Sequence, residues 1–513
     1  MIRSAADCPP CKARTGRWVL AATIVGSSMA FVDGTVVNVA LPVLQAELDA
    51  SVAGLQWIIE SYMLFLAALI LVGGMLGDRH GRRRMFAAGI VVFAASSVWC
   101  GLAPDAAMLI VARAAQGIGG ALLVPGSLSL ISATFGEAQR GRAFGLWSGF
   151  TALAMALGPP LGGWLVDNVS WRWIFFINIP PAVVVLWILH RHVPESRDEG
   201  AAGALDWPGA ALVTAGLGGL VFGLVEAGTA GFGAPGVLVP IVVGAAAMAA
   251  FLAIQSRSAT PMMPLELFRS RSFSGANLIT LLLYAGLSGG LFFFPFMLIQ
   301  VHGYSATAAG AAFLPFVVIM FLLSRWAGTM TSRFGGRPLL VAGPAIAAVG
   351  FALFAVPGAG GSYWTTYFPA VVVLGLGMAV SVAPLTTVVM AAVEVRRAGI
   401  ASGINNAVSR VAGLVAIAAM GVVVSAVFDD ALGASLATLD LPTEAVELLA
   451  AQRSSLAGTE VPLALGADQR AAVQGAIDAA FLAGFRLVMA IAAVLALASA
   501  AVAAITIERK AAE

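Results

Sequence analysis

The chain has 513 residues, of which 60% are hydrophobic and 11% are charged, and its mean hydropathy is +0.94. Soluble domains carry about 25% charged residues, so this composition excludes a soluble globular protein and predicts a chain that crosses a membrane many times. The formal net charge of +2 does not indicate a nucleic-acid partner.

The first apolar segment, 18–41, follows a short basic tail, 1–17. The segment is longer than the core of a signal peptide, is interrupted by Asp33 and lacks a small-residue cleavage site, so we expect an uncleaved first span. The tail contains Cys8 and Cys11, but one CxxC pair without a second pair or a nearby histidine does not predict a metal or redox site. We expect an unstructured tail.

A window of about 20 residues per span predicts an all-α membrane protein with fourteen transmembrane helices. The helices are expected at 18–41, 52–76, 84–103, 105–134, 141–166, 172–190, 206–227, 235–255, 273–299, 305–325, 338–356, 363–391, 398–427 and 478–507.

The distribution of arginines predicts the orientation. With the amino terminus in the cytoplasm, most basic residues of the connections fall on the cytoplasmic side, as the positive-inside rule requires, and an even number of spans returns the carboxyl terminus to that side. The cytoplasmic clusters are Arg79/Arg82/Arg83/Arg84, Arg140/Arg142, Arg191/Arg197, Arg257/Arg269/Arg271, Arg333/Arg337, Arg396/Arg397 and Arg509/Lys510, and only Arg172, Arg453 and Arg470 fall outside.

The chain is expected to form two pseudo-symmetric six-helix bundles with two extra helices between them. The expected parts are a cytoplasmic tail at 1–17, a first bundle at 18–190, a linker with the two extra helices at 191–272, a second bundle at 273–507 with an outer loop at 429–477, and a cytoplasmic tail at 508–513. Within the outer loop, two amphipathic stretches, 443–452 and 468–477, are expected to be surface helices.

Two motifs occur in both halves. Residues 74–81 match 328–335, and 117–125 match 375–384, after the same number of spans in each half once the extra pair is removed. Many secondary transporters are built from such repeats, with a substrate site between the halves near the midplane.

The segment 145–163 is a possible span made largely of glycine, alanine and proline. Its small residues recur at helical spacing on two faces, where neighbouring helices can approach backbone to backbone. Pro159 and Pro160 leave the carbonyls of Met155 and Ala156 without their helical donors, which is costly in hydrocarbon unless another group reaches them. We expect a bent helix that is a moving contact between the bundles; the alternative is a purely structural kink.

Three ionisable residues are predicted inside the membrane: Asp33, Glu60 and Arg113. Each lies about eight residues, roughly 12 Å, from the outer end of its helix. We therefore expect the two carboxylates to share one guanidinium and one of them to exchange a proton near neutral pH. Asp33 is the first candidate for this proton-coupling carboxylate and Glu60 is the second. The alternatives are that Glu60 lines a water-filled vestibule and that Arg113 only anchors helix carbonyls.

Several motifs, in chain order, resemble those of the major facilitator superfamily. Residues 74–83 are similar to its loop motif between helices two and three, 109–119 to its fourth-helix motif, and 158–163 to its fifth-helix antiporter motif. Asp33 in FVDGTVVNVALP, the run WRWIFFIN at 171–178 and the fourteen spans resemble its drug:proton antiporter branch. Two departures are Ser332, in place of the loop aspartate, and helices nine and ten without an acidic residue.

The resemblance implies a proton-coupled secondary transporter that exports lipophilic drugs or antibiotics, with cations favoured by the acidic groups, by alternating access. It implies a multi-pass protein of a bacterial cytoplasmic membrane, a monomer without cofactor, whose partners are substrate, proton and lipid. The alternative is a facilitator or symporter for a small metabolite such as an amino acid or sugar.

The predicted site residues fall into four groups, of which the last is an apolar, adaptable cavity. They are the proton-coupling residues Asp33, Glu60 and Arg113; a cytoplasmic latch of Gly74, Asp78, Arg79, Gly81 and Arg82; the antiporter helix residues Gly158, Pro159, Pro160, Gly162 and Gly163; and the substrate-cavity residues Trp57, Tyr62, Tyr284, Phe293, Met297 and Arg410.

Other classes of protein are not predicted. A phosphate-binding loop needs a lysine after a glycine-rich run, and the two lysines, Lys12 and Lys510, do not follow one. The four histidines are scattered, so we expect neither a metal site nor an enzyme.

Overall fold

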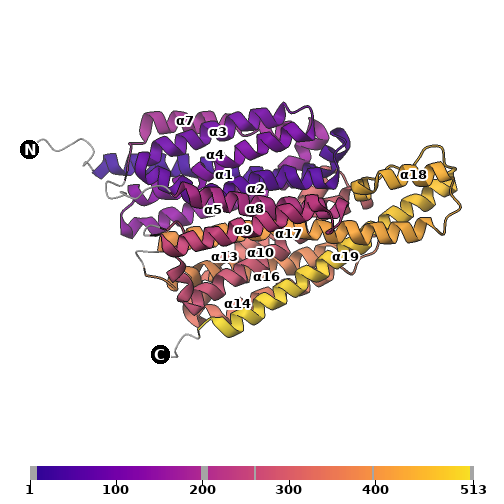
Figure 1. Ribbon diagram of the computed structural model, residues 1–513. Helices are drawn as coiled ribbons and strands as arrows, with labels where there is room; N and C mark the ends of the chain where they lie inside the picture. The colour runs from indigo at the N-terminus through magenta and orange to yellow at the C-terminus, as the bar shows by residue number, and fades with distance from the viewer. Residues whose placement is uncertain (1–8, 198–205, 259–260, 395–397, 509–513) are drawn as a thin grey trace, which may run out of the picture.

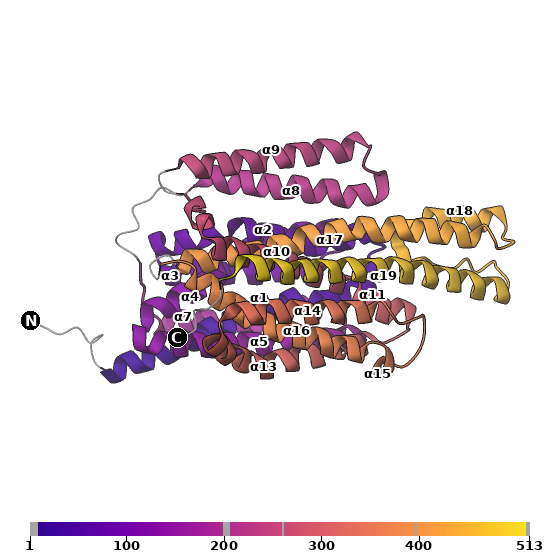
Figure 2. The same cartoon turned by 90° about the horizontal axis from the view of Figure 1, so that it is seen from below.

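The computed structural model describes residues 9–197, 206–258, 261–394 and 398–508. Within these ranges, fourteen helices are long and apolar enough to cross a membrane, which confirms the predicted number. Figures 1 and 2 show the helices running along one axis, with the start of α1 (Pro9–Glu47) and the end of α19 (Ala467–Thr506) at one end and α18 (Thr443–Ala451) at the other. We call these ends the terminal side and the distal side. Cys8 and the clusters Arg396/Arg397 and Arg509/Lys510 lie outside the described residues.

Seven helices form the first bundle. They are α1 (Pro9–Glu47), α2 (Val52–His80), α3 (Arg82–Gly101), α4 (Ala106–Thr134), α5 (Glu137–Asn168), α6 (Trp173–Phe176) and α7 (Ile179–His192). Side chains cap two of them at their distal ends: the Ser51 hydroxyl accepts from the Gly54 N–H at 3.2 Å, and the Asp105 carboxylate accepts from the Met108 N–H at 2.8 Å. The helix α1 begins nine residues before the expected first span.

The two extra helices, α8 (Trp207–Ala230) and α9 (Pro235–Arg257), pack against each other. The helix α8 also packs against α2 of the first bundle and α17 of the second. The extra pair therefore covers the seam between the bundles, which Figure 2 shows from below.

The second bundle has more breaks than predicted. Its elements are η2 (Leu265–Arg269), α10 (Arg271–Phe292), α11 (Phe294–Phe296), η3 (Met297–Val301), α12 (Ala306–Ala311), α13 (Leu314–Phe334), α14 (Gly336–Phe354), α15 (Tyr363–Thr366), α16 (Phe368–Ala391), α17 (Ala398–Leu436), α18 (Thr443–Ala451), η5 (Arg453–Gly458) and α19 (Ala467–Thr506). Pro295, Pro315 and Pro369 stand in the first turn after three of the breaks, where a missing N–H costs least.

The distal loop is shorter than predicted because two helices extend into it. The helix α17 continues nine residues past its expected end at 427, and α19 begins eleven residues before 478. The stretch 443–452 is a helix, α18, as predicted, whereas 468–477 is the first part of α19 rather than a separate surface helix. The expected bounds at 427 and 478 were placed where the apolar runs stop at charged residues. Both helices continue past these charged residues.

The predicted repeat is confirmed by packing. In the first half, α4 packs on α2 and α3, and in the second half α16 packs on α13 and α14. A Cβ at Gly119 would lie 2.6 Å from the backbone of α3, and one at Gly377 would lie 2.4 Å from the backbone of α14. The connections α2–α3 and α13–α14 turn at Gly81 and Gly335, with φ of +111° and +80°.

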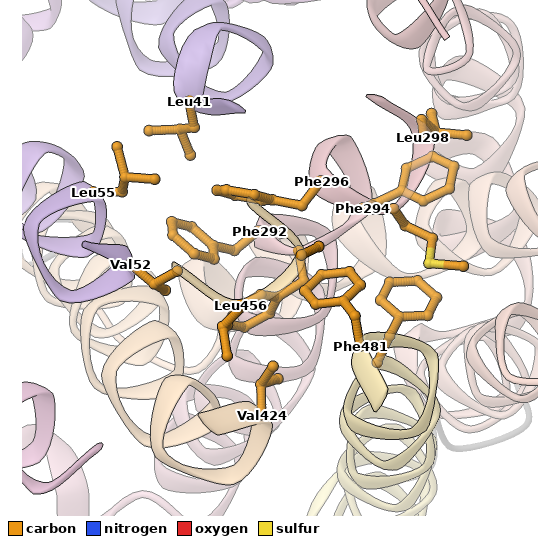
Figure 3. Close-up of a cluster of buried hydrophobic side chains, with 14 of the residues drawn as sticks. Leu41, Val52, Leu55, Phe292, Phe294, Phe296, Leu298, Val424, Leu456 and Phe481 are labelled. Atoms are coloured by element: carbon orange, nitrogen blue, oxygen red, sulfur yellow. The ribbon is translucent and has the colours of Figure 1, made fainter. Parts of the chain in front are cut away.

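The hydrophobic core is shared on the distal side and divided on the terminal side. Figure 3 shows the distal core, where Leu41 and Leu55 of the first bundle approach Phe292 and Phe296 of the second, with Leu456 of η5 nearby. Towards the terminal side, a separate cluster lies within the first bundle, with the partly buried Ala407 at its edge, and another lies within the second. Apolar packing therefore joins the bundles mainly at the distal end.

Candidate functional site

Asp33 of α1 and Arg113 of α4 form a buried ion pair. Their side chains are 0% and 1% exposed, and Arg113 Nη1 donates to Asp33 Oδ2 at 2.5 Å. Arg113 Nε also donates to the backbone carbonyl of Ile58 in α2 at 3.1 Å. The guanidinium therefore both pairs with a carboxylate and anchors a helix carbonyl, so the alternative in which Arg113 only anchors carbonyls is wrong.

Aromatic rings and a glycine position the guanidinium. It lies over the Tyr62 ring, 4.3 Å from the centroid, and is 5.9 Å from the ring centroid of Phe175. The α2 backbone approaches α4 because a glycine faces it: a Cβ at Gly117 would lie 2.4 Å from the Tyr62 carbonyl. Gly117 thus brings Tyr62 within reach of Arg113.

Three residues outside the predicted set complete the network. Gln116 Nε2 and Asn178 Nδ2 donate to Asp33 Oδ1 at 2.8 and 3.2 Å, and both also donate to the Ser97 hydroxyl. Gln116 lies three residues after Arg113 on the same helix face, and this spacing is a signal that could have identified it. Asn178 and Ser97 come from other helices, so only the fold brings them together.

Glu60 does not share the guanidinium with Asp33. Its side chain is 0% exposed, and neither carboxylate oxygen has a hydrogen-bond partner among the described residues. The expectation that Asp33 and Glu60 share the Arg113 guanidinium is therefore wrong, although both carboxylates lie in the first bundle. The reason is that Arg113 is occupied by Asp33, Ile58 and Gln116.

Among the described residues, the matching helix of the second half has no such charge network. In the repeat that pairs Gly117 with Gly375, the positions of Arg113 and Gln116 correspond to Val371 and Leu374, which are buried and apolar. At these matching positions, the ionisable and polar residues are therefore found in the first bundle and apolar residues in the second.

The antiporter segment of α5 contacts both bundles. Within the bundle, a Cβ at Gly162 would lie 2.9 Å from the Val36 carbonyl of α1, and the Thr35 hydroxyl lies 3.3 Å from the Met155 carbonyl that Pro159 leaves free. Across the seam, a Cβ at Gly163 would lie 2.2 Å from a carbonyl oxygen of α12. Pro160 continues the same helix. The small residues at 158 and 162 therefore meet α1 and Gly163 meets α12, whereas Gly145 and Gly149 have open space around them.

Gly163→Ala is expected to lower the thermal midpoint of the detergent-purified protein by several degrees. The new Cβ meets backbone of α12 that cannot rotate away, and such overpacking costs about 1–3 kcal/mol. Gly149→Ala, on the same helix with open space around it, is the control and should leave the midpoint unchanged or slightly raised. Equal shifts for both variants would contradict the close contact.

The predicted latch residues lie at the terminal side, within the first half. Arg82 binds Asp78 at 2.7 Å, four residues away, while Arg79 is exposed and Gly74 is in ordinary contact with Pro125. The position of Gly81 is explained by its positive φ. The described contacts of Asp78 do not reach the second bundle, so a role in holding the terminal side shut stays a prediction.

Glu195, which the sequence analysis did not single out, binds the same loop. Its carboxylate accepts from the N–H groups of Arg83 and Arg84 at 3.0 and 3.1 Å, at the start of α3. A Cβ at Gly81 would lie 2.7 Å from this carboxyl. The loop motif is thus held by the segment that leads from α7 to the extra helices.

Glu195→Ala is expected to cost about 1 kcal/mol of stability, the usual value of a helix-capping side chain. A fall of the thermal midpoint by a few degrees would check this. Arg84→Ala, whose side chain is 71% exposed, should change the midpoint much less. A midpoint unaffected by loss of Glu195 would show that its contacts do not hold the loop.

The predicted cavity residues are dispersed. Phe293 and Met297 are fully buried in the distal core, and Trp57 packs against Phe222 of α8 with ring centroids 6.0 Å apart. Tyr284 packs among apolar residues of the second bundle. Arg410 lies on α17 of the second bundle, and its Nε has no hydrogen-bond partner among the described atoms.

Two hollows lie beside α8. One, of about 370 Å³, is an open apolar hollow between α2 and α8, lined by residues that include Leu69 and Thr214. The other, of about 280 Å³, lies on the distal side between α2, α8, α17 and the distal loop, and includes Gln56, Asp429 and Arg453. In the described chain, no group of three His, Cys, Asp or Glu side chains is placed to hold a metal ion.

Two helical repeats, fourteen membrane-length helices and a buried charge network define a multi-pass membrane transporter. Residues 23–417 match the model of the Major Facilitator Superfamily, and the chain belongs to that family. The solved structures agree on the fold. A bacterial homolog of the human lysosomal transporter Spinster superposes with a TM-score of 0.66 at 18% identity, covering 95% of this chain and 96% of that one.

Curated relatives extend the similarity along the sequence. The tetracenomycin C resistance and export protein of Streptomyces glaucescens is 34% identical over 490 residues, 95% of this chain and 91% of that protein. The multidrug resistance protein Stp of Mycobacterium tuberculosis is 35% identical over 419 residues, 80% of this chain and 76% of that protein. The puromycin resistance protein pur8 of Streptomyces alboniger is 35% identical over 410 residues, 79% of this chain and 81% of that protein.

Proposed function

We propose that this protein exports lipophilic drugs or antibiotics across a bacterial cytoplasmic membrane in exchange for protons. The relatives are named for multidrug resistance, for resistance to tetracenomycin C and its export, and for puromycin resistance. Their similarity over most of the chain supports the same class of substrate here. The protein acts as a transporter rather than as an enzyme, and the proton gradient takes the place of a cofactor.

The terminal side faces the cytoplasm. The described arginines on this side outnumber those on the distal side, as the positive-inside rule predicts for a cytoplasmic face. They include Arg82, Arg83, Arg84, Arg140, Arg142, Arg191, Arg257, Arg269, Arg271, Arg333 and Arg337, against Arg172, Arg453, Arg470 and Arg486 on the distal side. In this orientation the shared distal core closes the outer side, and the divided cores lie towards the cytoplasm.

The observation that carries proton coupling is the difference between the two buried carboxylates. Asp33 is neutralised by Arg113 and accepts three hydrogen bonds. Glu60 is equally buried but has no described partner, and burying an ionised carboxylate without a partner is costly. This geometry supports Glu60 as the proton carrier and Asp33 as the counter-ion of Arg113, the reverse of the order expected from the sequence.

The available energy is sufficient for export. A proton that moves inwards releases about 1.4 kcal/mol per pH unit and about 2.3 kcal/mol per 100 mV. A one-for-one exchange with a monovalent cation moves no net charge and uses only the pH gradient, whereas exchange with a neutral compound uses both.

Proteoliposomes with separately imposed pH and voltage gradients test the proposal. In proteoliposomes that expose the cytoplasmic side of the transporter to the medium, a fluorescent lipophilic cation should accumulate only when the lumen is acidic. Nigericin, which collapses the pH gradient, should abolish this accumulation. Liposomes without protein give the background. Equilibration of the dye without accumulation would instead indicate a facilitator.

A further inference from the structure

The two bundles touch backbone to backbone at one place on the distal side. Gly163 of α5 faces the Ala306 carbonyl of α12, and in return Gly310 of α12 faces the Pro159 carbonyl of α5, where a Cβ would lie 2.1 Å away. Neither glycine can carry a side chain without separating the helices. The contact joins the first bundle to the second, so it must open if the distal side opens.

Asp167 binds across this contact. It lies one turn beyond Gly163, and its Oδ1 accepts from the Ala306 N–H at 3.1 Å. Its Oδ2 accepts from the Thr307 N–H at 2.7 Å and from the Thr307 hydroxyl at 2.5 Å. One carboxylate of the first bundle thus receives three hydrogen bonds from the second.

The other described hydrogen bonds between the bundles are made by neutral side chains. Gln45 binds Gln300 and the Ser455 carbonyl, and Gln56 binds the Ile417 carbonyl. Hydrogen bonds to an ionised group are roughly twice as strong as those between neutral groups. Asp167 is also exposed, so water can replace its partners when the bundles part. The contact is therefore strong enough to favour closure and accessible enough to break.

We propose that Asp167 is a positioning residue of the transport cycle, which holds the distal side closed through Ala306 and Thr307 and releases α12 when that side opens. The proposal rests on the alternating-access function proposed above. It assigns to Asp167 no contact with substrate or proton carrier. Its role is to set the ratio of the distal-closed to the distal-open conformation.

Distances between spin labels test this ratio directly. Labels on Leu102 and Val356, which are exposed at the distal ends of α3 and α14, report opening of the distal side by double electron–electron resonance. A second pair on His190 and Ile505, exposed near the terminal side, should report the opposite change. The native cysteines are replaced by serine, and wild-type transport is verified on that background.

Asp167→Asn is expected to raise the ratio of distal-open to distal-closed protein about tenfold, since it removes the charge and places an amide group against N–H donors. Thr307→Val removes only the hydroxyl contact and should produce a smaller shift in the same direction. The matched control is Asp105→Asn. Asp105 is an equally exposed aspartate on the distal side, but it binds Met108 within one bundle, so this variant should leave both distance distributions unchanged.

The proposal is overturned if folded Asp167→Asn protein keeps the wild-type distances, or if Asp105→Asn shifts them equally. Because no substrate is needed for the distance measurement, it is independent of what is transported. A shift with Asp167→Asn in a protein that fails to export any drug would refute the proposed function and leave the closure role standing. Drug export with unchanged distances in the variant would refute the closure role alone.

Discussion

Asp33→Asn is expected to abolish proton-driven drug uptake and to lower stability by about 3–5 kcal/mol, the usual cost of breaking a buried ion pair by removing one partner. The asparagine retains an acceptor for Gln116 and Asn178 but turns an amide group towards Arg113. The guanidinium, 1% exposed, then remains charged without a counter-ion. Thermal unfolding in detergent and uptake in proteoliposomes measure the two effects.

A double-mutant cycle separates the charge pair from the rest of the site. Arg113→Gln alone leaves Asp33 buried and unpaired, so it should be as destabilising as Asp33→Asn. The double variant has no buried charge at this position, and its stability should exceed that expected from the sum of the single losses. Transport should stay lost in all three variants because the positioned pair is missing.

Asp430→Asn serves as the surface control. Asp430 is exposed in the distal extension of α17, and such substitutions usually change stability by less than about 0.5 kcal/mol. If Asp33→Asn unfolded at the wild-type temperature and kept full gradient-driven uptake, the ion pair would be neither structural nor coupled to transport.

The sequence predicted what depends on spacing along one helix. The fourteen spans follow from hydropathy, the repeat from glycine spacing, and the close approach of other helices to α5 from its small residues, although the sequence did not identify those helices. Asp33 and Arg113 were paired because each is an isolated charge at a similar depth. These features depend on the residues of a single helix or on its length, so they can be inferred without knowing which helices are neighbours.

Features that depend on contacts between distant segments were not predicted. Asp167 is near the end of its span and looks like an ordinary interfacial aspartate, yet it binds the second bundle 139 residues later. Glu195 lies in a charged connection, where nothing in its neighbours indicates α3. The depth of a residue along its helix also does not say towards which neighbour its side chain points. For this reason Glu60, which was expected at the same depth as Arg113, was wrongly paired with it.

The two halves share a backbone arrangement but differ in their buried side chains, because close helix packing constrains only the small residues. Glycines at matching positions bring helices together in both bundles, so the backbone repeat is preserved. The side chains that fill the space differ: Arg113 and Gln116 in one half, Val371 and Leu374 in the other. Different side chains at these positions are compatible with one fold because the repeat constrains the small residues at the close contacts and leaves the other positions free.

Glu60→Gln is expected to separate coupling from stability. Glutamine is nearly the size of a protonated glutamate and is neutral, and Glu60 has no described partner to lose. Stability should therefore change by less than about 1 kcal/mol, in contrast to Asp33→Asn. Uptake driven by a pH gradient should fall more than tenfold, because the variant has no proton to exchange at this position.

Proton release provides the sharper measurement for this variant. When substrate binds wild-type protein in weakly buffered detergent solution, a carboxyl that gives up its proton acidifies the medium, and Glu60→Gln should remove this signal while substrate still binds. Arg410→Gln, on the opposite bundle, is the matched control, because it removes a partly buried charge but leaves the Glu60 carboxyl in place, and should retain proton release. A variant without Glu60 that still released protons would assign the coupling to another group, and Asp33 would then be the first to test.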